Sequence, residues 1–141
     1  MRWEGYFARE RVLARFSEAI QVPTVSHGGR QEAPRVGAAL ARNATTAAGG
    51  DGRRWDQFDR LLALMERNYP RVHAQLHRER LDCHSVVLVW NGSEPARLPV
   101  LLMGHMDVVP VEEGTEGDWE EAPFSGALRD RFVWGRGTLD C

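Results

Sequence analysis

The stretch SVVLVWNGSEPARLPVLLMGHMDVV (residues 85–109) indicates the fold class, because it contains two apolar runs separated by a turn. The first run, residues 85–90, is rich in β-branched residues and is closed by the turn signal Asn-Gly-Ser-Glu-Pro. The second run begins at Leu98 and continues to Val109. Continuous apolar runs are typical of strands buried on both faces of a parallel or mixed sheet. We therefore expect two buried strands in this stretch.

Three segments ahead of these runs have features of helices. In residues 6–20 and 53–69, apolar residues recur every three or four positions, and Pro23 and Pro70 bound the two patterns. A short helical piece is expected over residues 72–77. Helices followed by buried strands predict an α/β fold, in which the helices pack on a mixed, largely parallel sheet.

The remaining segments predict loops and a hairpin. Residues 26–54 are rich in Gly, Ala, Arg and Thr without a clear period, so we expect a surface loop, which could include a short helix over residues 34–42. The acidic, glycine-bearing stretch before Ala127 predicts another loop. After it, ALRDRFVWGRG predicts two short strands joined by a tight turn at Asp130 and Arg131.

Composition limits the classes of function. The 141 residues suit one domain, and a hydrophobic content of 43 % is enough for a packed core. The net charge of −2 predicts neither a nucleic-acid partner nor a basic membrane-binding patch, and no apolar run has the roughly 20 residues of a membrane span. No signal peptide is evident and only Cys83 and Cys141 are present, so a reducing cytoplasm is the expected compartment.

A histidine and a carboxylate follow the second apolar run, where a buried strand is expected to end. His105 and Asp107 are two residues apart, so in extended chain both side chains point to the same side. A carboxylate in this position can accept a hydrogen bond from one ring nitrogen of a metal-binding histidine and fix its tautomer. The alternative is a buried histidine bonded to its neighbour for structural reasons, and the spacing alone favours neither.

Asp140 is a second candidate ligand, because it follows a glycine-rich turn after the last aromatic strand. A loop leaving the sheet at this point could bring its carboxylate to His105, and the structural alternative is an aspartate that caps a following helix. His73 and His77 would lie one turn apart on a helix, where a solvated face is the better interpretation than a metal site. Arg136 could bind a substrate carboxylate or could equally hold the Gly-Arg-Gly turn in place.

These motifs together resemble peptidase family M20. LLMGHMDVVPV, DWEEAPFSGALRDRFVWGRGTLD and the earlier QVPTVS are similar to its carboxypeptidase S and N-acyl amino acid hydrolase (PM20D1-like) branch. The resemblance covers nearly the whole chain apart from residues 30–50. Two departures are visible: Cys141 stands where this branch usually has a second aspartate, and Arg131 replaces a turn glycine.

The resemblance implies a site with two zinc ions that hydrolyses the amide bond of a peptide or an N-acyl amino acid. His105 would bind one zinc ion, Asp140 would bridge both, and Asp107 would belong to the catalytic centre as the carboxylate that orients His105. The family's glutamate base and remaining ligands are expected beyond Cys141. Residues 1–141 are therefore expected to be an N-terminal part of the catalytic domain, inactive alone. The alternative is a truncated product or binding module without hydrolase activity, and the oligomeric state is not predicted.

Overall fold

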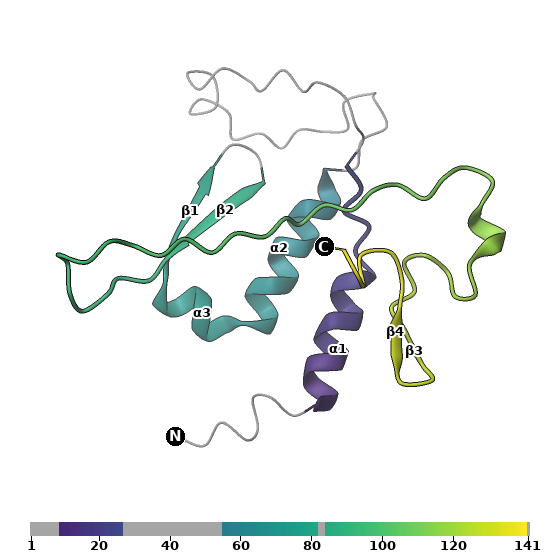
Figure 1. Ribbon diagram of the computed structural model, residues 1–141, viewed down its shortest axis with the longest axis horizontal. Helices are drawn as coiled ribbons and strands as arrows, with labels where there is room; N and C mark the ends of the chain where they lie inside the picture. The colour runs from purple at the N-terminus through teal and green to yellow at the C-terminus, as the bar shows by residue number, and fades with distance from the viewer. Residues whose placement is uncertain (1–8, 27–54, 82–83, 141) are drawn as a thin grey trace, which may run out of the picture.

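The computed structural model describes residues 9–26, 55–81 and 84–140 as helices and two small hairpins joined by a long extended segment (Figure 1). In chain order, the elements are α1 (Arg9–Ile20), α2 (Asp56–Asn68), α3 (Pro70–Gln75), β1 (His77–Leu81), β2 (Ser85–Val89), the 3₁₀ helix η2 (Glu116–Asp118), β3 (Ala127–Arg129) and β4 (Phe132–Trp134). The predicted loop over residues 26–54 and its short helix lie outside the described residues, except for Ser26.

The three helices predicted from the sequence are confirmed. One face of α2 is buried through Phe58, Leu61, Leu62 and Leu64, as the apolar spacing requires. Tyr69 donates its backbone N–H to the Met65 carbonyl at the end of α2 (2.8 Å), and Pro70 then begins α3, where a missing N–H has no cost. No helix among the described residues combines the length and the apolar character that crossing a bilayer would require.

A small core joins α1 and α2 to the extended segment. Val22, Leu61 and Leu64 form the buried cluster, and Ala19 and Met106 pack against it. Met106 belongs to the segment that crosses the helices in Figure 1 on its way from β2 to η2. The core therefore fixes this crossing segment one residue away from both His105 and Asp107.

Both sheets are antiparallel hairpins. β1 pairs with β2, with His77 opposite Val89, and β3 pairs with β4, with Ala127 opposite Trp134. β2 and the β3–β4 hairpin agree with the strands predicted from the sequence, but β2 is not buried, because Val89 is 40 % exposed. β1 was not predicted, because the sequence pattern places His77 in the preceding helix. His77 lies in β1 and His73 in α3, so the idea that the two share one helix face is wrong.

The prediction of a largely parallel sheet is wrong, although helices and strands do make an α/β combination. Within the described ranges, the parallel pairing is an isolated bridge between Val25 and Val108. The apolar run from Leu98 to Met103 is not a strand: Leu102 is 88 % exposed and Leu98 91 %. An apolar run becomes a buried strand only when neighbouring strands accept its hydrogen bonds, and no such neighbour is present among the described residues.

The β3–β4 hairpin rests on α1 through a close backbone approach. Ser17 donates its hydroxyl to the Gly126 carbonyl at 2.6 Å, and a Cβ atom at Gly126 would overlap the Ser17 carbonyl oxygen. Gly126 also has a φ of 60°, which favours glycine. This contact explains why the hairpin, which carries the chain towards Asp140, has a defined position beside the N-terminal helix.

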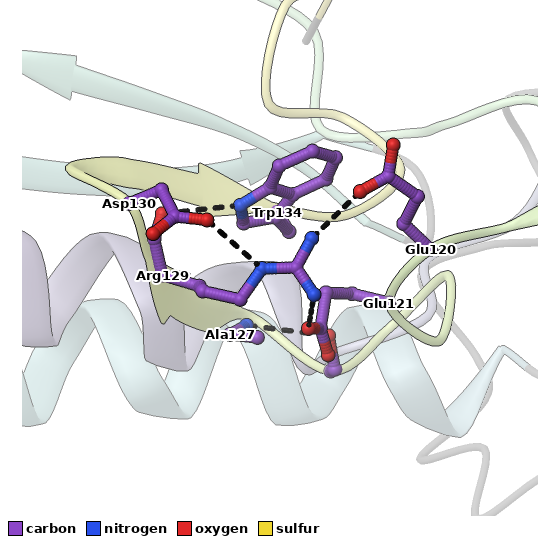
Figure 2. A network of polar contacts seen from close by, with 7 residues as sticks. Glu120, Glu121, Ala127, Arg129, Asp130 and Trp134 are labelled. Carbon is purple, nitrogen blue, oxygen red and sulfur yellow. Dashed lines mark hydrogen bonds and ion pairs between the residues drawn. The ribbon is translucent and has the colours of Figure 1, made fainter.

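Arg129 ties the same hairpin to the acidic loop that follows η2 (Figure 2). Its guanidinium contacts Glu121 at 2.6 Å and Glu120 at 2.7 Å, with Asp130 at 3.4 Å, and it stacks on the Trp134 ring. The Trp134 indole N–H in turn donates to the Arg129 carbonyl. Arg129 therefore connects the acidic loop, through Glu120 and Glu121, to the β3–β4 hairpin, through Trp134.

Candidate metal centre

His105 and Asp107 are positioned by a short parallel pairing with residues 24–26. Val108 donates its backbone N–H to the Thr24 carbonyl (2.9 Å), and Ser26 donates to the Val108 carbonyl (3.0 Å). The Thr24 hydroxyl also donates to the Met106 carbonyl at 2.6 Å. Because Met106 and Val108 face the protein interior, the alternation of an extended chain turns His105 and Asp107 to the opposite side.

The predicted contact between His105 and Asp107 is present. Nδ1 of His105 lies 3.2 Å from Oδ1 of Asp107 and 2.9 Å from the Asp107 carbonyl oxygen. A proton on Nδ1 can be donated to both oxygens, which favours the tautomer with a lone pair on Nε2. The buried structural alternative does not describe this pair, because the His105 side chain is 54 % exposed.

Asp140 reaches the other side of the same imidazole. Its Oδ1 lies 3.7 Å from Nε2 of His105, although the two residues are 35 positions apart in the chain. The turn from β4 passes through Gly135 and Gly137, both at positive φ, and brings Asp140 back across the cleft. The structure therefore brings together all three residues predicted for the site.

The pKa values of the pair are shifted in opposite directions. The pKa of His105 is raised, chiefly by the hydrogen bond to the Asp107 carbonyl; burial opposes this shift, and the carboxylates of Asp107 and Asp140 add to it. The pKa of Asp107 is lowered, chiefly by a hydrogen bond from the Ser26 side chain and also by His105. Asp107 is thus held as an anion, which can accept a hydrogen bond from the imidazole N–H without taking its proton.

These residues line a cleft of about 790 Å³ between the crossing segment and the β3–β4 hairpin. The cleft is also lined by Trp119, Trp134 and Arg136, and the Arg136 guanidinium stacks on the Trp119 ring at 5.0 Å. A cleft of this size accommodates a small organic molecule. The predicted ligands therefore face a space that a substrate could enter.

The chemistry of the donor atoms fits zinc, although the set is incomplete. Imidazole nitrogen and carboxylate oxygen are both zinc ligands, and two such atoms on one tetrahedral ion lie about 3.3 Å apart, near the 3.7 Å between Nε2 of His105 and Oδ1 of Asp140. Among the described residues, no group of three or more His, Cys, Asp or Glu side chains is arranged to hold a metal ion. This part of the chain thus supplies a pair of ligands.

Ser26 is the site residue that the sequence did not reveal. It lies 81 positions before Asp107, and its hydroxyl helps to hold that carboxylate in its ionised form. QVPTVS (residues 21–26) resembles the family motif, but neither its composition nor its spacing indicates a contact with Asp107. Such a contact follows from the pairing of two distant segments and has no local signal.

Comparison with known proteins supports the resemblance. The family profile described as Peptidase family M20/M25/M40 matches residues 101–141, which include His105, Asp107 and Asp140. Carboxypeptidase S of Saccharomyces cerevisiae is 33 % identical over 135 residues, covering 94 % of this chain and 21 % of that protein. No solved structure matches the chain.

Two vertebrate relatives carry a different name. The N-fatty-acyl-amino acid synthase/hydrolase PM20D1.1 of Danio rerio is 31 % identical and covers 94 % of this chain and 22 % of its own length. PM20D1 of Mus musculus, with the same description, is 36 % identical over 86 % of this chain and 20 % of its own length. The chain thus spans about a fifth of the length of the curated relatives it matches.

Proposed function

This chain belongs to the carboxypeptidase S and PM20D1-like branch of peptidase family M20, and on that premise we propose that it contributes zinc ligands to an amide hydrolase. The observation that carries the proposal is the 3.7 Å approach of Asp140 Oδ1 to Nε2 of His105 inside a cleft. The proposed substrate is a peptide with a free carboxylate or an N-acyl amino acid, which is in keeping with relatives named carboxypeptidase S and N-fatty-acyl-amino acid synthase/hydrolase.

Each residue has a distinct role in this proposal. His105 offers the Nε2 lone pair, Asp140 offers a carboxylate that can bridge two ions, and Asp107 holds the Nδ1 proton and so orients the imidazole. Zinc, when bound, supplies a Lewis acid that makes water a nucleophile near neutral pH. The protein groups themselves provide orientation and charge: two carboxylates beside one histidine offset the charge of a cation.

Residues 1–141 are proposed to be part of a catalytic domain of this family. As a separate protein they are expected to bind zinc weakly and to have no hydrolase activity, because a co-catalytic site needs more ligands and a general base than His105, Asp107 and Asp140 provide. A binding module with no hydrolase relationship has less support, because the relatives named above are described as carboxypeptidases or hydrolases.

Zinc titration of the chain by calorimetry tests the proposed ligands. His105→Ala and Asp140→Asn should each lower zinc affinity at least tenfold, since each removes one of the two donors. His77→Ala is the matched control, because His77 is an exposed histidine in β1, outside the cleft. Equal zinc affinity in the wild type and both site variants would refute the proposed ligands.

A further inference from the structure

Arg136 is a cation in the cleft whose charge has no counter-ion among the described residues. Its guanidinium lies over the Trp119 ring, and its buried Nε has no hydrogen-bond partner in the described part of the chain. Its backbone N–H donates to the Pro123 carbonyl at 2.6 Å, so its main chain is held in place at the edge of the cleft that His105 also lines. Burying a charged group costs free energy unless an ion-pair or hydrogen-bond partner compensates for the lost water.

Arg129 provides an internal comparison, because it is stacked in the same way. The guanidinium carbon lies 4.9 Å from the ring centre of Trp134 in one case and 5.0 Å from that of Trp119 in the other. Arg129 is surrounded by the carboxylates of Glu120, Glu121 and Asp130 (Figure 2), so the two arginines differ in their ion pairs, although the buried Nε of each has no hydrogen-bond partner in the described part of the chain. Glu120 lines the cleft as well, yet it pairs with Arg129 and not with Arg136.

Stacking on an indole ring occupies one face of a guanidinium and leaves its N–H edge to act as a donor. That edge is planar and forked, which matches the two oxygens of a carboxylate. Zinc in the proposed site and Arg136 would then be two separate positive charges along one cleft. A substrate with a carbonyl at one end and a carboxylate at the other would satisfy both.

We infer that Arg136, held against Trp119, is the subsite that binds the free carboxylate of the substrate. This inference rests on the proposed function and deepens it, because it names the residue that selects an acid over a neutral amide. Of the two roles that the sequence left open for Arg136, the inference takes the binding of a substrate carboxylate, since a guanidinium that merely held the turn would be expected to bond to groups of the turn.

The test is an NMR titration of the ¹⁵N-labelled chain in the presence of a chelator, with N-acetyl-L-phenylalanine and its uncharged amide as probes. The acid should shift the Arg136 Nε–H and Trp119 indole signals and bind at least tenfold more tightly than the amide. Arg136→Gln should remove this preference. Arg97→Gln makes the same charge change on an arginine outside the cleft and should retain it.

Wild-type protein that does not prefer the acid over the amide, or an Arg136→Gln protein that still does, would overturn the inference. If circular dichroism shows that Arg136→Gln is unfolded, Arg136→Lys decides instead: it keeps the charge without the fork and should lose at least half of the preference. Because zinc is absent throughout, the result is independent of the zinc titration, and either proposal can fail while the other stands.

Discussion

At the scale of single residues, Asp107 connects the predicted ligand His105 to the segment that contains Ser26. It contacts His105 and receives a hydrogen bond from the Ser26 side chain, so its charge and direction are both fixed. We predict that Asp107→Ala lowers zinc affinity about 10–100-fold, the usual scale for the loss of a group that orients a metal-binding histidine. The measurement is the dissociation constant from zinc titration.

Asp118→Ala is the control for Asp107→Ala, because it removes one negative charge from the lining of the same cleft. It should change zinc affinity by less than about threefold, the scale of a screened interaction with an exposed charge. Similar losses in the two variants would mean that Asp107 acts only through its charge, and the orienting role would be rejected.

His84 predicts a pH dependence of stability. Burial against the rings of Trp55 and Phe58 lowers the pKa of His84, against an opposing effect of the Asp59 carboxylate. Because the unfolded chain binds the proton more readily, this group destabilises the fold as the pH falls from about 6.5, its ordinary value, through the lowered one. His84→Phe should therefore flatten the fall in the free energy of unfolding between pH 7 and 5.

Urea denaturation of wild type and His84→Phe at several pH values measures this effect. The difference between the two curves isolates His84, because His105 and the carboxylates titrate in both proteins. Parallel curves over this range would show that His84 does not have the lowered pKa. The phenyl ring keeps the stacked position, so the comparison does not depend on losing the aromatic cluster.

The residues of the site could be predicted from the sequence where their contacts are local or where the family resemblance placed them. The His105–Asp107 contact follows from a spacing of two in extended chain. The position of Asp140 after a glycine-rich turn made it a candidate partner of His105, the family resemblance strengthened that prediction, and the structure places the two side chains 3.7 Å apart. Ser26 could not be predicted, because its contact depends on which distant segments pair.

At the scale of elements, the turn between β3 and β4 contains a conformation that its sequence does not favour. Asp130 and Arg131 have φ values of 52° and 72°, the signature of a two-residue hairpin turn in which Asp-Gly is preferred. We predict that Arg131→Gly stabilises the chain by about 0.5–1 kcal/mol, because it relieves the Cβ crowding at positive φ. The free energy of unfolding in urea checks this.

Arg131→Ala separates this effect from the loss of the arginine side chain. Alanine removes the charge but keeps the Cβ atom at positive φ, so it should give no gain in stability. If alanine stabilises the chain as much as glycine does, the backbone explanation is wrong and a charge effect at the turn would have to replace it.

Helices and hairpins were predictable to different degrees for a physical reason. α2 has its apolar face and its end signals within one segment, so the sequence contains the whole pattern. The apolar run from Leu98 to Met103 is compatible with a strand, but its sequence cannot show whether a neighbouring strand is present to accept its hydrogen bonds. β1 was missed because it has few apolar residues and is defined by its pairing with β2.

At the scale of the whole molecule, the crossing segment leaves a row of apolar side chains in contact with water. Leu101, Leu102 and Met103 are 74 %, 88 % and 86 % exposed. Contiguous exposed apolar surface favours association. We predict that the chain binds a hydrophobic dye and aggregates on concentration, and that Leu102→Lys reduces both while changing the free energy of unfolding by less than about 0.5 kcal/mol.

Leu62→Lys is the contrasting variant, because Leu62 is buried in α2. It places a charge in the core and should destabilise the chain by several kcal/mol. Light scattering, dye fluorescence and thermal unfolding measure the three quantities together. If Leu102→Lys destabilises the chain as Leu62→Lys does, Leu102 is packed in solution and the row is not exposed.

The hydrogen bond between Thr24 and Met106 can form only late during synthesis of the chain on the ribosome. The two residues are 82 positions apart, so a ribosome that adds roughly 5–20 residues per second needs about 4–16 s to produce the second partner after the first. In the later part of that interval α1 and α2 can meet, because α2 is complete at Asn68, but residues 24–26 still have no partner segment to pair with. The cleft that holds His105 is therefore among the last parts of this chain to take shape as it is made.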